Sequence, residues 1–135
     1  MQRFLIVPED LALFLTLVER QFGESHPFFY ACRFTEALKI AKDESKFVFL
    51  YLHSPENPFA APFCCDTFCS QLVMEFLDAN CVSWGAIASR GEGLEMVSAL
   101  QANTSPFCAV VAPASGKAIA VLQQAVEDIY YKKQF

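Results

Sequence analysis

The sequence predicts an α/β fold with a central mixed sheet of about four strands, flanked by helices and preceded by an extra N-terminal helix. Three observations support this class. Strand patterns alternate with amphipathic helical patterns along the chain, as in folds with a parallel sheet. The last two strand patterns are separated by a short turn, which predicts an antiparallel hairpin at one edge. A chain of 135 residues, 54% of them apolar, can form one packed domain.

The first helix is expected from Pro8 to Phe22, with Gly23 as its C-terminal stop. One apolar stripe at the helical period supports it: Leu11, Phe14, Leu15, Val18 and Phe22. The acidic pair Glu9-Asp10 interrupts the apolar N-terminal residues, and an acid at bilayer depth costs about 3 kcal/mol. We therefore expect neither a signal peptide nor a transmembrane segment, and reduced cysteines in the cytosol.

A second helix is expected from Thr35, its N-cap, to Glu44. Its inward side chains should be Phe34, Leu38 and Ala41. The following run, residues 47–52, is apolar without interruption. That pattern is typical of a strand buried on both faces, in the middle of a sheet.

The second half of the chain alternates in the same way. We expect a helix over residues 70–80, a strand over 81–88, a helix after Arg90–Gly93, strands over 107–112 and 118–122 around a Ser115-Gly116 turn, and a last helix over 125–133. The inner faces of the first two of these helices should be Val73, Phe76 and Leu77, and Leu94, Val97 and Leu100. This order of elements is the thioredoxin-like arrangement.

The segment KFVFLYLHSPENPFAAPFCCDTFCS, residues 46–70, places three cysteines where thioredoxin-type proteins carry their redox motif. The spacing Cys64-Cys65-x3-Cys69 differs from C-x2-C. On a regular helix Cys65 and Cys69 would stand about 5–6 Å apart, whereas a disulfide needs Cβ atoms about 3.5–4.5 Å apart. A Cys64–Cys65 disulfide would strain the peptide between them. We expect structural thiols and no enzyme; a thiol oxidoreductase or redox sensor using Cys65 or Cys69 is the alternative.

Other candidates for chemistry are weaker. Cys32, Cys81 and Cys108 lie in apolar surroundings and should be small core residues. Pro106 precedes a strand where thioredoxin-like folds place a cis proline, here expected only to set the strand entry. His53 could join the three thiols in a zinc site, but a Pro-rich loop separates it from them, so neither metal nor cofactor is expected.

Charge narrows the choice of ligands. The net charge of −5, without a long cationic run, argues against nucleic-acid binding. Lys39, Lys42 and Lys46 follow one another at i, i+3 and i+7 and could form a basic strip on the second helix. An ordinary solvated face is the simpler interpretation; binding of a lipid carboxylate or an anionic membrane surface is the alternative. The 14 Phe residues supply apolar material for such a ligand.

Four blocks carry a family resemblance: FGESHPFFY (22–30), TEALKIAKDESKFVFLYLHS (35–54), FCCDTFCS (63–70) and NTSPFCAVV (103–111). In this order they resemble the UAS domain of UBX-domain proteins of the Fas-associated factor type, with a plant member as the narrower expectation. The resemblance runs from about Phe14 to about Leu122. After the last strand the sequence departs from the family pattern, so the closing helix of this single UAS domain, residues 1–135, is expected to be atypical or truncated.

The resemblance implies a thioredoxin-like fold and a role in multidomain adaptors. Their UBX domain recruits the valosin-containing AAA ATPase to ubiquitylated cargo for degradation. In some members the UAS domain binds long-chain unsaturated fatty acids and self-associates. This implies a non-catalytic interaction module in the cytoplasm, at the cytosolic face of the endoplasmic reticulum or on lipid droplets. A shortened, less stable product that has lost its function is a further hypothesis.

Overall fold

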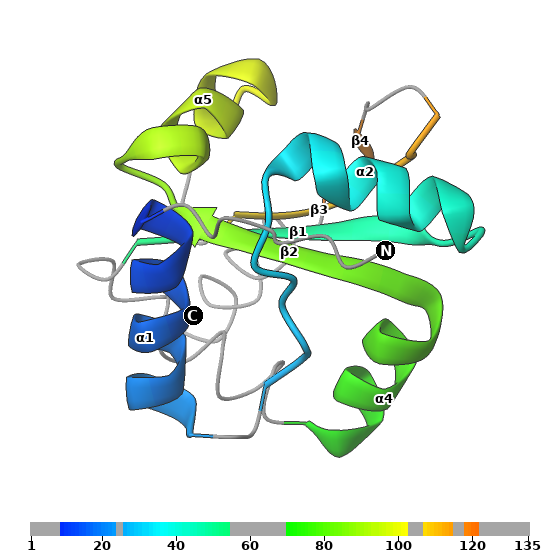
Figure 1. Ribbon diagram of the computed structural model, residues 1–135, viewed down its shortest axis with the longest axis horizontal. Coiled ribbons are helices and arrows are strands. Elements are labelled where there is room, and N and C mark those ends of the chain that lie inside the picture. Colours follow the sequence, from blue (N-terminus) through cyan, green and yellow to red (C-terminus); the bar gives the residue numbers. More distant parts are fainter. Residues whose placement is uncertain (1–8, 24–25, 55–69, 103–106, 115–117, 122–135) are drawn as a thin grey trace, which may run out of the picture.

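A four-stranded sheet lies in the middle of the molecule. The computed structural model describes residues 9–23, 26–54, 70–102, 107–114 and 118–121. The strands are β1 (Phe47–His53), β2 (Cys81–Ile87), β3 (Phe107–Val111) and β4 (Ala118–Val121), in the order β2-β1-β3-β4. The helices are α1 (Glu9–Phe22), α2 (Phe34–Asp43), α4 (Gln71–Asn80) and α5 (Gly91–Ala99). The predicted mixed sheet with flanking helices and an extra N-terminal helix is confirmed (Figure 1).

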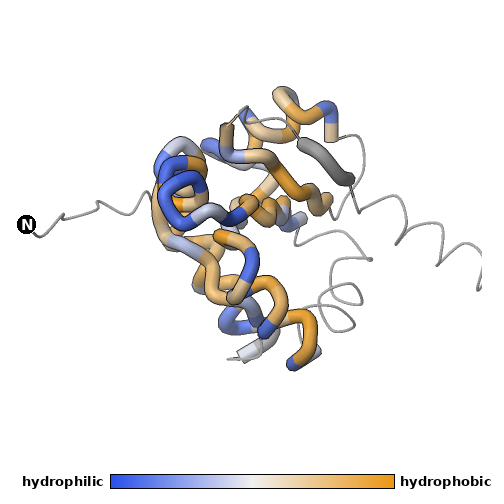
Figure 2. The backbone as a smooth tube through the Cα atoms, turned by 90° about the vertical axis from the view of Figure 1, so that its right-hand side faces the viewer, coloured by the Kyte–Doolittle hydropathy of each residue, from blue (hydrophilic) through white to orange (hydrophobic). Residues whose placement is uncertain are grey.

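Strand β1 is the centre of this sheet. It runs parallel to β2, with Phe47 opposite Cys81 and His53 opposite Ile87. It runs antiparallel to β3, with Tyr51 opposite Cys108. Every residue of β1 after Phe47 is buried, which confirms the strand expected to be covered on both faces. Figure 2 shows hydrophobic residues in the middle of the molecule and also at intervals along the helices.

Alternating side chains of β1 and β2 fill two separate clusters, one on each face of the sheet. The face toward α2 and α5 contains Val48, Leu50, Leu52, Val82, Trp84 and Ala86. The face toward α1 and α4 contains Phe49, Tyr51, Cys81 and Ile87 together with Phe14 and Phe29. Figure 1 shows the two helix pairs on opposite sides of the sheet.

Helix α1 reaches the sheet through Phe14. Its ring occupies the space above Gly85 of β2, where an added Cβ would overlap the ring atoms. The ring also makes an edge-to-face contact with Phe29, with centroids 5.2 Å apart. The helix ends as predicted at Gly23, whose φ of +61° suits glycine and whose N–H donates to the Glu19 carbonyl at 2.8 Å.

The start of α2 corrects the expected Thr35 cap. The helix begins at Phe34, and its N-cap residue Arg33 makes no side-chain hydrogen bond to the first turn. Instead, the N–H of Phe34 donates to Glu92 Oε2 at 3.0 Å. The Glu92 carboxylate of α5 therefore caps the N-terminus of α2, in place of the expected Thr35 hydroxyl. This contact joins two helices that are far apart in the chain.

Two side chains that were expected to face inward are exposed. Phe76 of α4 is 63% exposed, while Leu77 is buried. Successive helical residues point about 100° apart, so the helix directs Leu77 to the sheet and turns Phe76 away. Leu94 of α5 is 54% exposed because the neighbouring Gly93 lies directly against the Ile87 carbonyl, which turns Leu94 outward.

Several predictions fall outside the described residues. They are the helix over residues 125–133, the Ser115-Gly116 turn and the Pro-rich loop after Ser54. The domain limits, 1–135, likewise stay a prediction.

Substitution Gly85→Ala should destabilise the fold, because the new methyl group and the Phe14 ring need the same space. Overpacking of this kind costs about 1–3 kcal/mol in the free energy of unfolding, measurable by chemical denaturation. The same substitution in a Phe14→Leu background should cost less, because the smaller side chain leaves room. Equal losses in both backgrounds would contradict this packing.

Candidate functional site

Strand β1 ends at His53, at the sheet edge where a thioredoxin-type site would begin. The predicted thiols Cys64, Cys65 and Cys69 that follow this strand, and the predicted cis proline Pro106, lie outside the described residues. Their roles stay predictions. Among the described residues no group of three or more His, Cys, Asp or Glu side chains could hold a metal ion.

His53 lies inside the protein, with 1% of its surface exposed. Its Nδ1 shares a hydrogen bond of 2.7 Å with the Tyr51 hydroxyl, and the Phe14 ring lies 6.4 Å away. Nε2 is buried and has no hydrogen-bond partner. Burial lowers the pKa of His53 to about 4, so the imidazole is neutral at physiological pH.

The three described cysteines are buried, as predicted. Burial, together with the nearby carboxylates Glu36 and Glu92, raises the pKa of the Cys32 thiol to about 11. Burial also raises the pKa of Cys81, against the opposing effect of Lys46. Since the thiolate is the reactive form, Cys32 and Cys81 are weak nucleophiles at neutral pH.

The structure divides the predicted lysine strip. Lys39 and Lys42 are exposed on α2, three residues apart. Lys46 lies beyond the end of the helix, and its Nζ is 3.3 Å from Glu44 Oε1. Two of the three candidate anion-binding cations are thus exposed on one helix, and the third is paired with a carboxylate.

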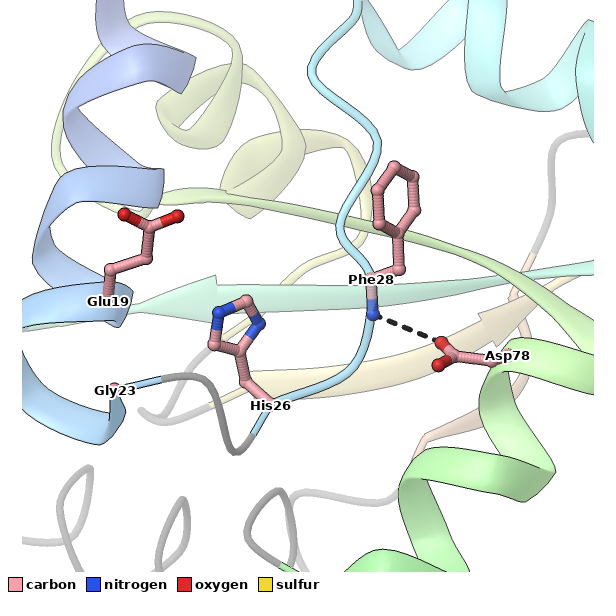
Figure 3. A pocket seen from close by; sticks show the side chains of 5 residues that line it. All are labelled: Glu19, Gly23, His26, Phe28 and Asp78. Carbon is pink, nitrogen blue, oxygen red and sulfur yellow. Dashed lines mark hydrogen bonds between the residues drawn. The ribbon is translucent and has the colours of Figure 1, made fainter.

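A pocket of about 550 Å³ lies between the C-terminal ends of α1 and α4 (Figure 3). Its lining residues are Glu19, Gly23, His26, Phe28 and Asp78. Sequence reasoning missed it, because three separate segments contribute these residues and no local spacing links them. Two of the residues, His26 and Phe28, come from the connector between α1 and α2, described over residues 26–33.

Hydrogen bonds fix the shape of this pocket. The N–H of Phe28 donates to Asp78 Oδ1 at 3.0 Å, which ties the connector to α4. His26 Nδ1 lies 2.7 Å from the Pro27 carbonyl oxygen, so this nitrogen carries the proton and donates. The ring stacks on Phe29 at 6.0 Å. Figure 3 shows the His26 ring between the helix that carries Glu19 and the helix that carries Asp78.

A second pocket, of about 420 Å³, lies where the N-terminal ends of α1, α2 and α5 converge. Two of its acidic residues, Asp10 and Glu92, make contacts that hold helices together. Arg90 Nε donates to Asp10 Oδ1 at 2.8 Å, and Glu92 accepts from the N–H of Phe34. These contacts connect the three helices.

Comparison with known proteins decides the family. The model of the family described as Fas-associated factor 1 matches residues 14–124. The chain belongs to the Fas-associated factor family. Plant UBX domain-containing protein 10 of Arabidopsis thaliana is 40% identical over 82% of this chain. FAS-associated factor 2 is 34% identical in Xenopus tropicalis and 31% identical in Homo sapiens, over 76% of this chain.

These relatives confirm the predicted family. The chain spans about a quarter of the length of the relatives it matches: 24% of the plant protein and 23% of the two animal proteins. A thioredoxin from Thermus thermophilus has a similar fold, with a TM-score of 0.61 over 80% of this chain and 89% of that structure. At 18% identity this likeness shows the fold alone, and it confirms the predicted thioredoxin-like fold. None of the described helices of this family member is long and apolar enough to cross a membrane.

Acid should destabilise the protein through His53. In the unfolded chain its pKa is the ordinary 6.5, whereas in the folded chain it is about 4. Below 6.5 the unfolded state takes up a proton that the folded state does not bind. Stability should therefore fall as the pH drops toward 4, by about 3 kcal/mol from this group.

The measurement compares unfolding of the wild type and a His53→Gln variant between about pH 7 and about pH 4. Carboxylates titrate in both proteins, so the difference isolates His53. NMR titration of the wild-type imidazole gives its pKa directly. Parallel stability curves, or an imidazole that titrates near 6.5, would show that His53 is not buried as described.

Proposed function

We propose that this chain is a non-catalytic interaction module of a UBX-type adaptor. In this proposal the full-length adaptor links ubiquitylated cargo to the valosin-containing AAA ATPase in protein degradation. Membership in the Fas-associated factor family supports the adaptor role. The observation that carries the interaction role is one apolar face of α4, where Leu72 and Phe76 are 76% and 63% exposed.

Large apolar side chains exposed beside one another are informative, whereas a single exposed one is ordinary. Leu72 and Phe76 are four residues apart and therefore share one face of α4. Phe28 lies on another flank of α4, because its N–H is bonded to Asp78, about 200° round the helix from Phe76. An apolar surface of this kind is typical of protein or lipid contact. The described thiols add no sign of redox chemistry, since burial keeps Cys32 and Cys81 protonated.

We further propose that the module responds to long-chain unsaturated fatty acids by self-association, at the cytosolic face of the endoplasmic reticulum or on lipid droplets. Lys39 and Lys42 are exposed on α2 and offer two cations to a carboxylate or an anionic membrane surface. Leu72 and Phe76 of α4 lie on the opposite side of the sheet from these lysines (Figure 1), so they suit contacts between copies and not the acyl chain of a lipid held at α2. This peripheral mode of binding needs no membrane-spanning helix.

Light scattering with added oleate tests this lipid response. The mass of the wild-type particles should rise with oleate, and a Lys39→Glu/Lys42→Glu variant should respond less, because its helix repels the carboxylate. The matched control is Lys132→Glu/Lys133→Glu, which changes the net charge equally. A wild type that stays monomeric with oleate would contradict the lipid response. Equal loss in both variants would mean that net charge, and not the α2 strip, controls it.

A further inference from the structure

We propose that the pocket between α1 and α4 binds an arginine side chain presented by a protein partner. This inference rests on the proposed interaction role and names the chemistry of one partner. The pocket is lined by Glu19, Gly23, His26, Phe28 and Asp78, and its volume of about 550 Å³ is ample for a long side chain. It is separate from the lysines of α2 and from the carboxyl end of β1.

The pocket carries uncompensated negative charge. Glu19 and Asp78 are both exposed, and neither forms an ion pair within the described part of the chain. Asp78 Oδ1 accepts the N–H of Phe28, which leaves Oδ2 for another donor. The two carboxylates come from different helices and line the same pocket.

The C-terminal ends of α1 and α4 add to the negative potential of the pocket. Glu19 lies in the last turn of α1 and Asp78 in the last turn of α4, where the helix dipole is negative and favours cations. Helix α4 has no basic residue in that turn. Its Phe76 carbonyl receives only a neutral donor, the Asn80 side-chain amide at 2.9 Å. Helix α1 has one basic residue there, Arg20.

An aromatic wall distinguishes the pocket from a simple acidic patch. The Phe28 ring lines it and is 64% exposed. Its position is fixed by an edge-to-face contact with Tyr30, at 5.1 Å, and by the backbone bond to Asp78. In Figure 3 the Glu19 carboxylate and the rings of His26 and Phe28 rise from the backbone on the same side.

Guanidinium fits this combination better than other cations. Its flat face stacks on an aromatic ring, while its five N–H donors can reach more than one carboxylate. A lysine ammonium is a compact, strongly hydrated charge that makes less use of the ring. A metal ion needs a closer set of ligands, and the described residues hold no such group of three. The charge and the ring together therefore select arginine.

NMR titration of the 135-residue chain tests the proposal, with the blocked tripeptide Ac-Ala-Arg-Ala-NH2 as the probe. Saturable shifts are expected at Glu19, Gly23, His26, Phe28 and Asp78. The same peptide with citrulline keeps the shape of arginine but lacks its charge, and it should bind more weakly. The lysine peptide should also bind more weakly than the arginine peptide.

Charge-neutral variants locate the site. Glu19→Gln and Asp78→Asn should each weaken arginine binding about two- to fivefold, the range of one exposed ion pair. In the Asp78→Asn variant the side-chain amide oxygen can still accept the Phe28 N–H, so the connector should stay in place. The matched control, Glu75→Gln, removes one charge from α4 outside the pocket and should leave binding unchanged.

Four results would overturn the proposal: no saturable shift, equal binding of the arginine and citrulline peptides, equal binding of arginine and lysine, or an equal effect of Glu75→Gln. Pocket shifts that appear with protein concentration alone would mean that a second copy covers the pocket, and would also overturn it. The oleate response is read by particle mass and involves other residues. Either the lipid response or arginine binding can therefore fail while the other stands.

Discussion

The hydrogen bond from the buried Trp84 indole to the connector holds the rest of the structure in place. Nε1 donates to the Cys32 carbonyl at 2.8 Å, and the ring packs edge-to-face on Phe34 at 5.2 Å. One side chain of β2 thereby fixes the segment between α1 and α2 and the first residue of α2. A buried indole N–H without a partner would cost about 1–3 kcal/mol, so the connector and the sheet depend on each other.

This anchoring also shapes the pocket between α1 and α4. The connector runs beside the outer edge of β2, where Phe29 forms a parallel bridge with Ser83 and the N–H of Tyr30 donates to the Ser83 carbonyl at 2.9 Å. The connector thus covers an edge that would otherwise expose unpaired backbone groups. With the backbone fixed on both sides, His26 and Phe28 are held between the ends of α1 and α4. The pocket is therefore a consequence of how the sheet edge is closed.

Sequence reasoning succeeded where local periodicity determines structure and failed where distant segments meet. The continuous apolar run predicted the central strand, and the stripe that contains Phe14 predicted α1. The N-terminus of α2 could not be predicted, because its partner Glu92 lies on another helix. The exposure of Phe76 depends on how α4 meets the sheet. The acidic pocket could not be predicted, because Glu19 and Asp78 lie far apart in the sequence and line one pocket only in the folded chain.

A thioredoxin-like scaffold that serves binding, as proposed, should not catalyse dithiol exchange. Insulin reduction with dithiothreitol, measured beside thioredoxin, tests this because it includes every cysteine of the chain. We predict that insulin precipitates no faster than with dithiothreitol alone. Turnover comparable to that of thioredoxin would contradict the account and would assign the chemistry to Cys65 or Cys69.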